Sequence, residues 1–92
     1  MIRIFKILIE AKMTVKELIL DSLIDDDEAR TEIKAFFDFC ETDIAENELD
    51  RILDEMLAEG LISINYEWKN EKGEFPYSLT GKGRDAWKNI VA

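Results

Sequence analysis

The sequence has 92 residues, 47% of them hydrophobic, which is enough apolar material for one domain with a core and too much for a disordered chain. It has a net charge of −9, a single cysteine, Cys40, and no histidine. These counts exclude an intrachain disulfide, and they exclude Ser–His triads, Cys–His pairs and zinc sites within one chain. We predict no enzyme activity and no bound cofactor or metal, although a magnesium or calcium site made of carboxylates alone stays open.

The predicted compartment follows from two absent signals. The most apolar run, residues 1–9, contains Arg3 and Lys6 and is far shorter than the ~20 residues of a membrane span. The same run lacks the long apolar stretch and the small-residue cleavage site of a signal peptide. We therefore predict a cytoplasmic protein without a membrane partner.

Charge is spread unevenly along the chain. Residues 1–20 have a net charge of +2, residues 21–60 have −12, and residues 61–92 have +1. The middle of the chain would repel a polyanion, whereas the two ends would not.

The first apolar run fits two kinds of secondary structure. Ile2, Phe5 and Ile9 share one face of a helix, but the β-branched residues of the run also suit a strand. Of the two, we favour a helix over residues 2–9.

A better-marked helix follows Thr14. Thr14 and Glu17 have the spacing of a capping box, in which each side chain bonds the backbone N–H of the other residue. This helix should end near Ile24, before the acidic run at residues 25–28. Its core-facing stripe consists of Val15, Leu18, Ile19 and Leu23.

Two more helices are predicted in the first 59 residues, which contain neither glycine nor proline. One starts at about residues 28–31 and runs to Phe39 or Cys40. The next is capped by Asp43 and ends at Gly60, where a left-handed cap is needed. The inward face of that third helix consists of Leu49, Ile52, Leu53, Met56 and Leu57.

After Gly60 the apolar pattern changes to the two-residue period of strands. The outgoing strand has Ile62, Ile64, Tyr66 and Trp68 on one face. Residues 69–74 form a polar loop, and a return strand follows with Phe75, Tyr77 and Leu79. Thr80 can cap a final helix that contains Ala86, Trp87, Ile90 and Val91.

Two phrases of the sequence carry a resemblance to known regulators. Residues 49–62, LDRILDEMLAEGLI, resemble the recognition helix and its exit into the wing in MarR- and PadR-type regulators of bacteria or archaea. Residues 77–83, YSLTGKG, resemble the phrase that closes the wing in those families. The resemblance implies an α+β, mainly α, winged helix-turn-helix fold with a three-helix core, a two-stranded β-hairpin wing and a C-terminal helix.

The predicted domain organisation is a single winged-helix domain over residues 1–92. Its parts are an N-terminal flanking segment (1–13), a helical core (14–60), the wing hairpin (61–80) and the C-terminal helix (81–92).

The resemblance implies a DNA-binding regulator of transcription whose third helix enters the major groove and whose hairpin loop touches backbone or minor groove. Residues 43–59, however, hold seven acidic groups and one basic group, and DNA affinity comes largely from neutralising phosphates. DNA contacts would therefore depend on the wing, the helix edge and the N-terminal basic residues. Candidates at the wing and helix edges are Lys69, Lys72, Lys82, Arg84 and Arg51; those near the N-terminus are Arg3, Lys6, Lys12 and Lys16.

The acidic third helix also supports an alternative function. The domain would then be a protein-interaction module that docks on a basic protein partner, at the extreme by imitating the charge of DNA. The candidate acidic interaction face consists of Glu48, Asp50, Asp54 and Glu55.

Two apolar groups have an open role. A homodimer contact is predicted at Ile2, Ile4, Phe5 and Leu8, with packing against the chain's own core as an equal alternative. The hairpin aromatics are Tyr66, Trp68, Phe75 and Tyr77, for which we favour cross-strand packing over a platform for bases. Trp68 lies next to the loop tip and is the one expected to be partly exposed.

Overall fold

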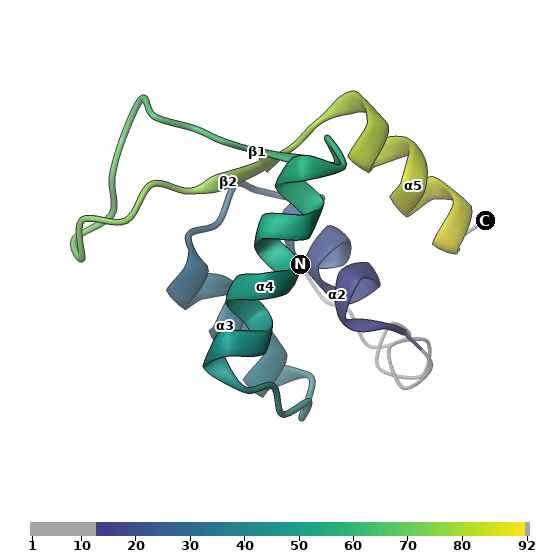
Figure 1. Cartoon of the computed structure of the whole chain (residues 1–92), viewed down its shortest axis with the longest axis horizontal. Helices are drawn as coiled ribbons and strands as arrows, with labels where there is room; N and C mark the ends of the chain where they lie inside the picture. The colour runs from purple at the N-terminus through teal and green to yellow at the C-terminus, as the bar shows by residue number, and fades with distance from the viewer. Residues whose placement is uncertain (1–12, 92) are drawn as a thin grey trace.

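The computed structural model describes residues 13–91, which form four helices and one two-stranded antiparallel sheet (Figure 1). In chain order the elements are α2 (Val15–Leu23), α3 (Arg30–Phe39), α4 (Glu46–Ala58), β1 (Ile62–Ile64), β2 (Tyr77–Leu79) and α5 (Gly81–Val91). The predicted order of three helices, a hairpin and a C-terminal helix is confirmed. None of the helices within residues 13–91 is long and apolar enough to cross a membrane. The prediction for residues 2–9 lies outside the described residues.

The first described helix begins as the capping box predicts. Glu17 N–H donates to Thr14 Oγ1 at 3.2 Å, and Thr14 N–H donates to Glu17 Oε1 at 2.9 Å. Helix α2 ends at Leu23, one residue before the predicted end.

One apolar core holds the helices and the sheet together. Its buried side chains come from α2, α3, the connection before α4, α4 itself and both strands: Leu18, Ile19, Leu20, Leu23, Ile33, Phe37, Ile44, Leu49, Ile52, Leu53, Met56, Ile62 and Leu79. Burying each such side chain contributes roughly 1.5–3 kcal/mol, so this core is the main source of stability. The predicted inward face of α4 is confirmed, with Leu57 at its partly buried margin.

The start of α4 differs from the prediction. Asp43 does not cap it: the N-cap is Ala45, which has no side-chain cap, and the helix begins at Glu46. Ile44 is 8% exposed and belongs to the same core cluster as Leu49. These two residues occupy the positions of a hydrophobic staple, so apolar burial sets the helix start in place of a polar cap.

Gly60 ends α4 as predicted. It has a φ of +76°, a conformation that glycine adopts without steric cost. Leu61 N–H donates to Met56 O at 3.0 Å and Gly60 N–H donates to Leu57 O at 3.1 Å. This pair of bonds is a Schellman motif, which turns the chain directly into β1.

The hairpin is shorter than the alternation of residues predicts. Ile62 pairs with Leu79 and Ile64 with Tyr77, and β1 ends at Ile64. The predicted continuation of the strand to Trp68 is wrong, because Asn65 Oδ1 accepts a hydrogen bond from Glu67 N–H at 2.9 Å and bends the chain into a turn. On its other edge β2 pairs with Glu28, which exchanges two backbone hydrogen bonds with Tyr77 at 2.8 and 3.2 Å.

The junction into α5 depends on a hydroxyl and a glycine. Thr80 Oγ1 accepts a hydrogen bond from Gly83 N–H at 3.0 Å, which confirms Thr80 as the cap, and it donates to Gly60 O at 2.6 Å. A Cβ atom at Gly83 would lie 2.1 Å from Leu61 O, so only glycine fits there. Helix α5 then packs along α2 through its partly buried Ala86, Trp87 and Ile90.

Candidate nucleic-acid interface

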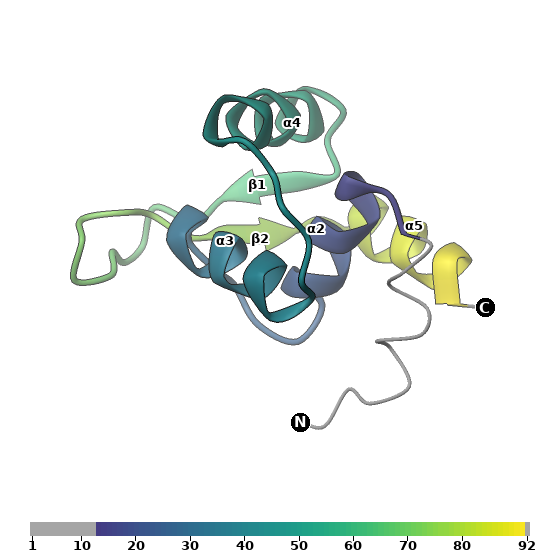
Figure 2. The ribbon, with the colours of Figure 1, turned by 90° about the horizontal axis from the view of Figure 1, so that it is seen from below.

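Two exposed elements form the candidate interface: helix α4 and the wing, which we define as residues 62–79. The loop of the wing extends well beyond the helices at one end of the molecule (Figure 2). Helix α4 lies along one edge of the molecule in the same view. A helix and a hairpin presented in this way are the parts that a winged helix offers to a partner.

The outward side of α4 is strongly acidic, as the sequence predicts. Its apolar residues face the core, and the side chains that remain on the outside include six carboxylates and one guanidinium. The acidic residues are Glu46, Glu48, Asp50, Asp54, Glu55 and Glu59, and the basic one is Arg51.

Arg30, at the start of α3, compensates part of this charge. Its Nη2 lies 2.8 Å from Glu46 Oε1, its Nε forms a hydrogen bond with Asp50 Oδ1, and Nη2 also donates to Glu46 O at 3.3 Å. The hydrogen bond to Asp50, followed by that to Glu46, raises the pKa of Arg30 above its ordinary value. The Arg30 side chain is 28% exposed, so these ion pairs lie at the edge of the interface.

The C-terminal half of α4 is compensated from α2 and from within the helix. Lys16 Nζ lies 3.0 Å from Glu59 Oε2 and 3.5 Å from Glu55 Oε1. Arg51 pairs with Glu55 one turn later and, at 3.9 Å, with Glu48. Exposed pairs contribute about 0–1 kcal/mol each, so their main effect is on the local field.

The predicted acidic face therefore divides into two groups. Asp50 and Glu55 are held by cations of the same chain, and Glu48 is held weakly. Asp54 is exposed and forms no ion pair with the residues that the structure describes. The chain thus uses a good part of its acidic face internally.

The predicted basic contacts do not form one cluster. Lys69 and Lys72 lie in the wing loop, whereas Lys82 and Arg84 follow β2 at the opposite end of the hairpin. Lys82 Nζ donates to the backbone carbonyl of Glu59 at 2.7 Å, where it stabilises the C-terminus of α4. Of the basic candidates, the two wing lysines and Arg84 are the least engaged within the chain.

Aromatic residues shape the wing without forming a strand ladder. Tyr66 and Phe75 pack edge to face with ring centroids 5.0 Å apart, and Lys69 Nζ lies 5.4 Å from the centroid of Phe75. Tyr66 is 69% exposed and Trp68 is 45% exposed. One aromatic pair thus packs across the wing, but beyond the ends of the two strands and not within them. Trp68 is exposed as expected.

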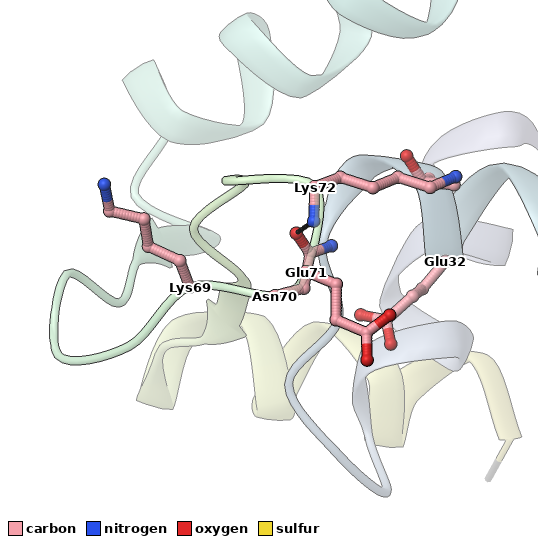
Figure 3. Close-up of a pocket in the computed structure, with 6 residues that line it drawn as sticks. Glu32, Lys69, Asn70, Glu71 and Lys72 are labelled. Atoms are coloured by element: carbon pink, nitrogen blue, oxygen red, sulfur yellow. Dashed lines mark hydrogen bonds between the residues drawn. The ribbon is translucent and has the colours of Figure 1, made fainter.

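A shallow cleft of about 480 Å³ separates the wing loop from the first turn of α3 (Figure 3). Its lining residues are Thr31, Glu32, Lys69, Asn70, Glu71 and Lys72. The side chain of Lys69 is directed away from α3, and Asn70 Oδ1 accepts a hydrogen bond from Lys72 N–H at 2.9 Å. Within residues 13–91, no three acidic or cysteine side chains gather closely enough to hold a metal ion.

Sequence reasoning missed three residues that organise this region. Arg30 carries the main charge compensation of α4, and Asn70 and Glu74 form the hydrogen bonds that shape the wing loop. The partners of Arg30 lie 16 and 20 positions away and Thr31 lies 43 positions from Glu74, so no local pattern reports these contacts. The side chain of Asn70 bonds residues two and four positions away. One signal in the sequence was Ala29, because an alanine before a helix cannot cap it and the helix start then needs a partner from elsewhere in the chain.

Comparison with known proteins identifies the fold. No family model matches the chain, and no curated protein is significantly similar to it in sequence. Among solved structures, a PadR-family transcription regulator from Clostridium difficile R20291 aligns over 84% of this chain and 82% of its own, with a TM-score of 0.69 and 21% identity. RosR from H. salinarum aligns over 87% and 72%, with a TM-score of 0.70 and 21% identity.

A third structure, Bacillus subtilis PadR in complex with operator DNA, aligns over 84% of this chain with a TM-score of 0.69 and 21% identity. The match spans 45% of the length of that protein. These likenesses confirm, at the level of fold, the resemblance carried by residues 49–62 and 77–83. The chain has the winged-helix fold of the PadR-family regulators.

Proposed function

We propose that the chain is a winged-helix DNA-binding regulator of transcription. The observation that carries the proposal is the match in fold, over 84% of the chain, to a PadR protein whose structure contains operator DNA. Helix α4 and the wing are both exposed here, as a helix that enters the major groove and a loop that reaches the backbone must be.

The ion pairs of α4 reduce the electrostatic objection to this function. Arg30 and Lys16 lie against carboxylates of α4 at 2.8–3.5 Å, so the helix presents less negative charge than its own sequence suggests. Arg51 is the one basic side chain within the helix, and its 59% exposure supports it as a further phosphate contact despite its ion pair with Glu55. The remaining acidic groups still oppose close approach, so affinity should depend on the wing.

The wing lysines are the proposed phosphate-binding residues. Lys69 and Lys72 are exposed and belong to the wing loop, which projects beyond the helices (Figure 1). Near 50 mM salt, changing both to Gln should weaken binding to duplex DNA by about tenfold for each phosphate that is no longer neutralised, and should flatten the salt dependence. Fluorescence anisotropy with a labelled duplex across a salt series measures both quantities.

A charge-matched control separates local binding from net charge. The double change of Lys34 and Lys88 to Gln also removes two positive charges, but from α3 and α5 instead of from the wing. It should weaken binding much less than the wing pair. Absence of any salt-dependent binding of wild-type protein to genomic duplex at low ionic strength would remove the proposal.

A second candidate function rests on the uncompensated part of α4. Asp54, which forms no ion pair with the described residues, and Glu48, which Arg51 approaches only to 3.9 Å, favour a basic protein as partner. The double change of Glu48 and Asp54 to Lys discriminates the two functions. It should raise affinity for DNA if α4 approaches the groove, whereas it should abolish a complex with a basic protein if α4 is the docking face.

A homodimer is also part of the proposal, because two copies would place two wings on one duplex. The predicted contact residues Ile2, Ile4, Phe5 and Leu8 lie outside the described residues. Light scattering after size-exclusion chromatography measures the mass directly. Changing Phe5 and Leu8 to Lys should convert a dimer to a monomer if this segment forms the contact.

A further inference from the structure

Helix α3 begins without a local cap. Its N-cap residue is Ala29, which has no side-chain oxygen, and Glu32 reaches back to accept a hydrogen bond from Ala29 N–H at 2.7 Å. The first turn of a helix needs acceptors for its free N–H groups and favours negative charge. Near Ala29 in the sequence, Glu32 supplies one such acceptor and one negative charge, and Ala29 itself supplies none.

The wing supplies a second carboxylate to this helix. Glu74 Oε2 accepts a hydrogen bond from Thr31 Oγ1 at 2.9 Å, across 43 residues of sequence. Glu74 Oε1 accepts from Asn70 Nδ2 at 2.9 Å, and Asn70 Oδ1 accepts from Glu74 N–H at 3.0 Å. One carboxylate therefore both closes the wing loop and attaches it to α3.

The linker before α3 attaches the base of the wing in the same way. Asp27 Oδ2 accepts a hydrogen bond from Asn65 Nδ2 at 3.2 Å. Glu28 exchanges backbone hydrogen bonds with Tyr77 at 2.8 and 3.2 Å. Residues 27, 28 and 31 thus hold the wing at three successive points.

The same short segment also holds α4. Arg30 lies between Glu28 and Thr31 and pairs with Glu46 and Asp50 in the first turns of α4. Neighbouring residues in the linker and the first turn of α3 are therefore bonded to the two separate elements of the candidate interface. We define residues 27–31 as the hub.

We infer that the hub is a positioning device, and that Glu74 is the positioning residue which sets the wing at a defined distance from α4. The inference rests on the proposed function in so far as DNA is the partner that requires this distance. Duplex DNA has a fixed spacing between grooves and phosphates, so a loose wing no longer reaches its phosphates even though its lysines are intact.

A distance measurement tests the inference without DNA. Spin labels are placed at exposed positions of α4 and the wing, by Asn47→Cys and Lys72→Cys in a Cys40→Ser background, and their separation is measured by pulsed electron resonance. The parent should give one narrow distribution. Glu74→Ala and Thr31→Val should each broaden or shift it.

Two matched variants serve as controls. Glu71→Ala removes a neighbouring wing carboxylate that lines the cleft, and Thr42→Val removes a hydroxyl whose hydrogen bond is the local one to Cys40 O at 3.3 Å. Both should leave the distribution unchanged. An unchanged distribution in Glu74→Ala and Thr31→Val, or an equal broadening in the controls, overturns the inference.

A DNA-binding cycle then tests the functional consequence. In the wild-type background, changing Lys69 and Lys72 to Gln should lower affinity at least tenfold, whereas in the Glu74→Ala background the same change should lower it less than twofold. Equal effects in both backgrounds overturn the role of Glu74 in binding. If the distances move but no variant binds DNA, the proposed function fails while the positioning of the wing stands.

Discussion

Trp87 Nε1–H donates a hydrogen bond to Asp21 Oδ1 at 3.0 Å, and this contact joins α5 to α2 through a carboxylate that is fully buried. A buried polar oxygen requires hydrogen-bond donors from the protein, because burial removes it from solvent. The indole meets that need from a residue 66 positions later in the chain. The C-terminal helix is therefore bound to the core by polar as well as apolar contact.

Replacing Trp87 with Phe should lower the free energy of unfolding by about 1–3 kcal/mol, since the buried carboxylate loses a donor. Urea denaturation followed by circular dichroism measures the change. Trp68→Phe is the control, because Trp68 is 45% exposed and its indole should contribute less than about 0.5 kcal/mol. Equal stabilities for the two variants would show that the hydrogen bond contributes nothing.

Replacing Gly83 with Ala should destabilise the protein by about 3 kcal/mol, at the upper end of the range for overpacking. The new methyl group would meet Leu61 O at 2.1 Å, and backbone at that position has little room to move. Gly81→Ala is the matched control, because no atom lies within 4 Å of a Cβ atom there. Thermal unfolding of both variants should show a lower midpoint for Gly83→Ala alone.

The Glu74 carboxylate should give stability that depends on pH. Hydrogen bonds from Asn70 and, to a smaller extent, Thr31 lower the pKa of Glu74 below its ordinary value, against the opposing effect of desolvation. The contribution of Glu74 to the free energy of unfolding is therefore complete above the pKa that its carboxyl has in the unfolded chain, near 4.5. This contribution is lost as the pH falls through the lower pKa that the same carboxyl has in the folded chain. Glu74→Gln should be less stable than wild type at pH 7, and the difference should shrink towards pH 3.

Arg30 should stabilise the protein in a way that depends on salt. Replacing Arg30 with Met removes ion pairs with Glu46 and Asp50 and should cost about 1 kcal/mol at low salt. The cost should fall in 1 M NaCl, where screening weakens the pairs of the wild type. Lys34→Met, which removes a single exposed pair at 3.5 Å to Asp38, is the control and should show a smaller cost.

Signals within about five residues predicted this fold well. The capping box of Thr14 and Glu17, the left-handed turn at Gly60 and the cap at Thr80 each involve atoms that are close in sequence. The apolar period of α4 likewise reports which face is buried, because a helix repeats its geometry every turn. These features were enough to predict the order of helices and hairpin, and the resemblance of residues 49–62 and 77–83 to known regulators added the winged-helix fold.

The failures of sequence reasoning have a common cause, because in each case a competing interaction decided the local structure. Asp43 has the chemistry of a helix cap, but burial of Ile44 in the core starts α4 at Glu46 instead. The alternation through Tyr66 and Trp68 has the period of a strand, but the Asn65 side chain turns the chain after Ile64.

The candidate site depended on the tertiary structure far more than the fold did. From sequence alone, α4 is an acidic ridge that repels DNA; in the folded chain, Lys16 of α2 and Arg30 of α3 lie against it. The attachment of the wing through Glu74 and Thr31 is equally invisible in the sequence. Residue types determined which segments became helix, turn and core, because those choices depend on neighbours along the chain. The charge of the interface and the place of the wing were decided by side-chain pairs 16 to 43 residues apart, since only folding brings such side chains within reach of one another.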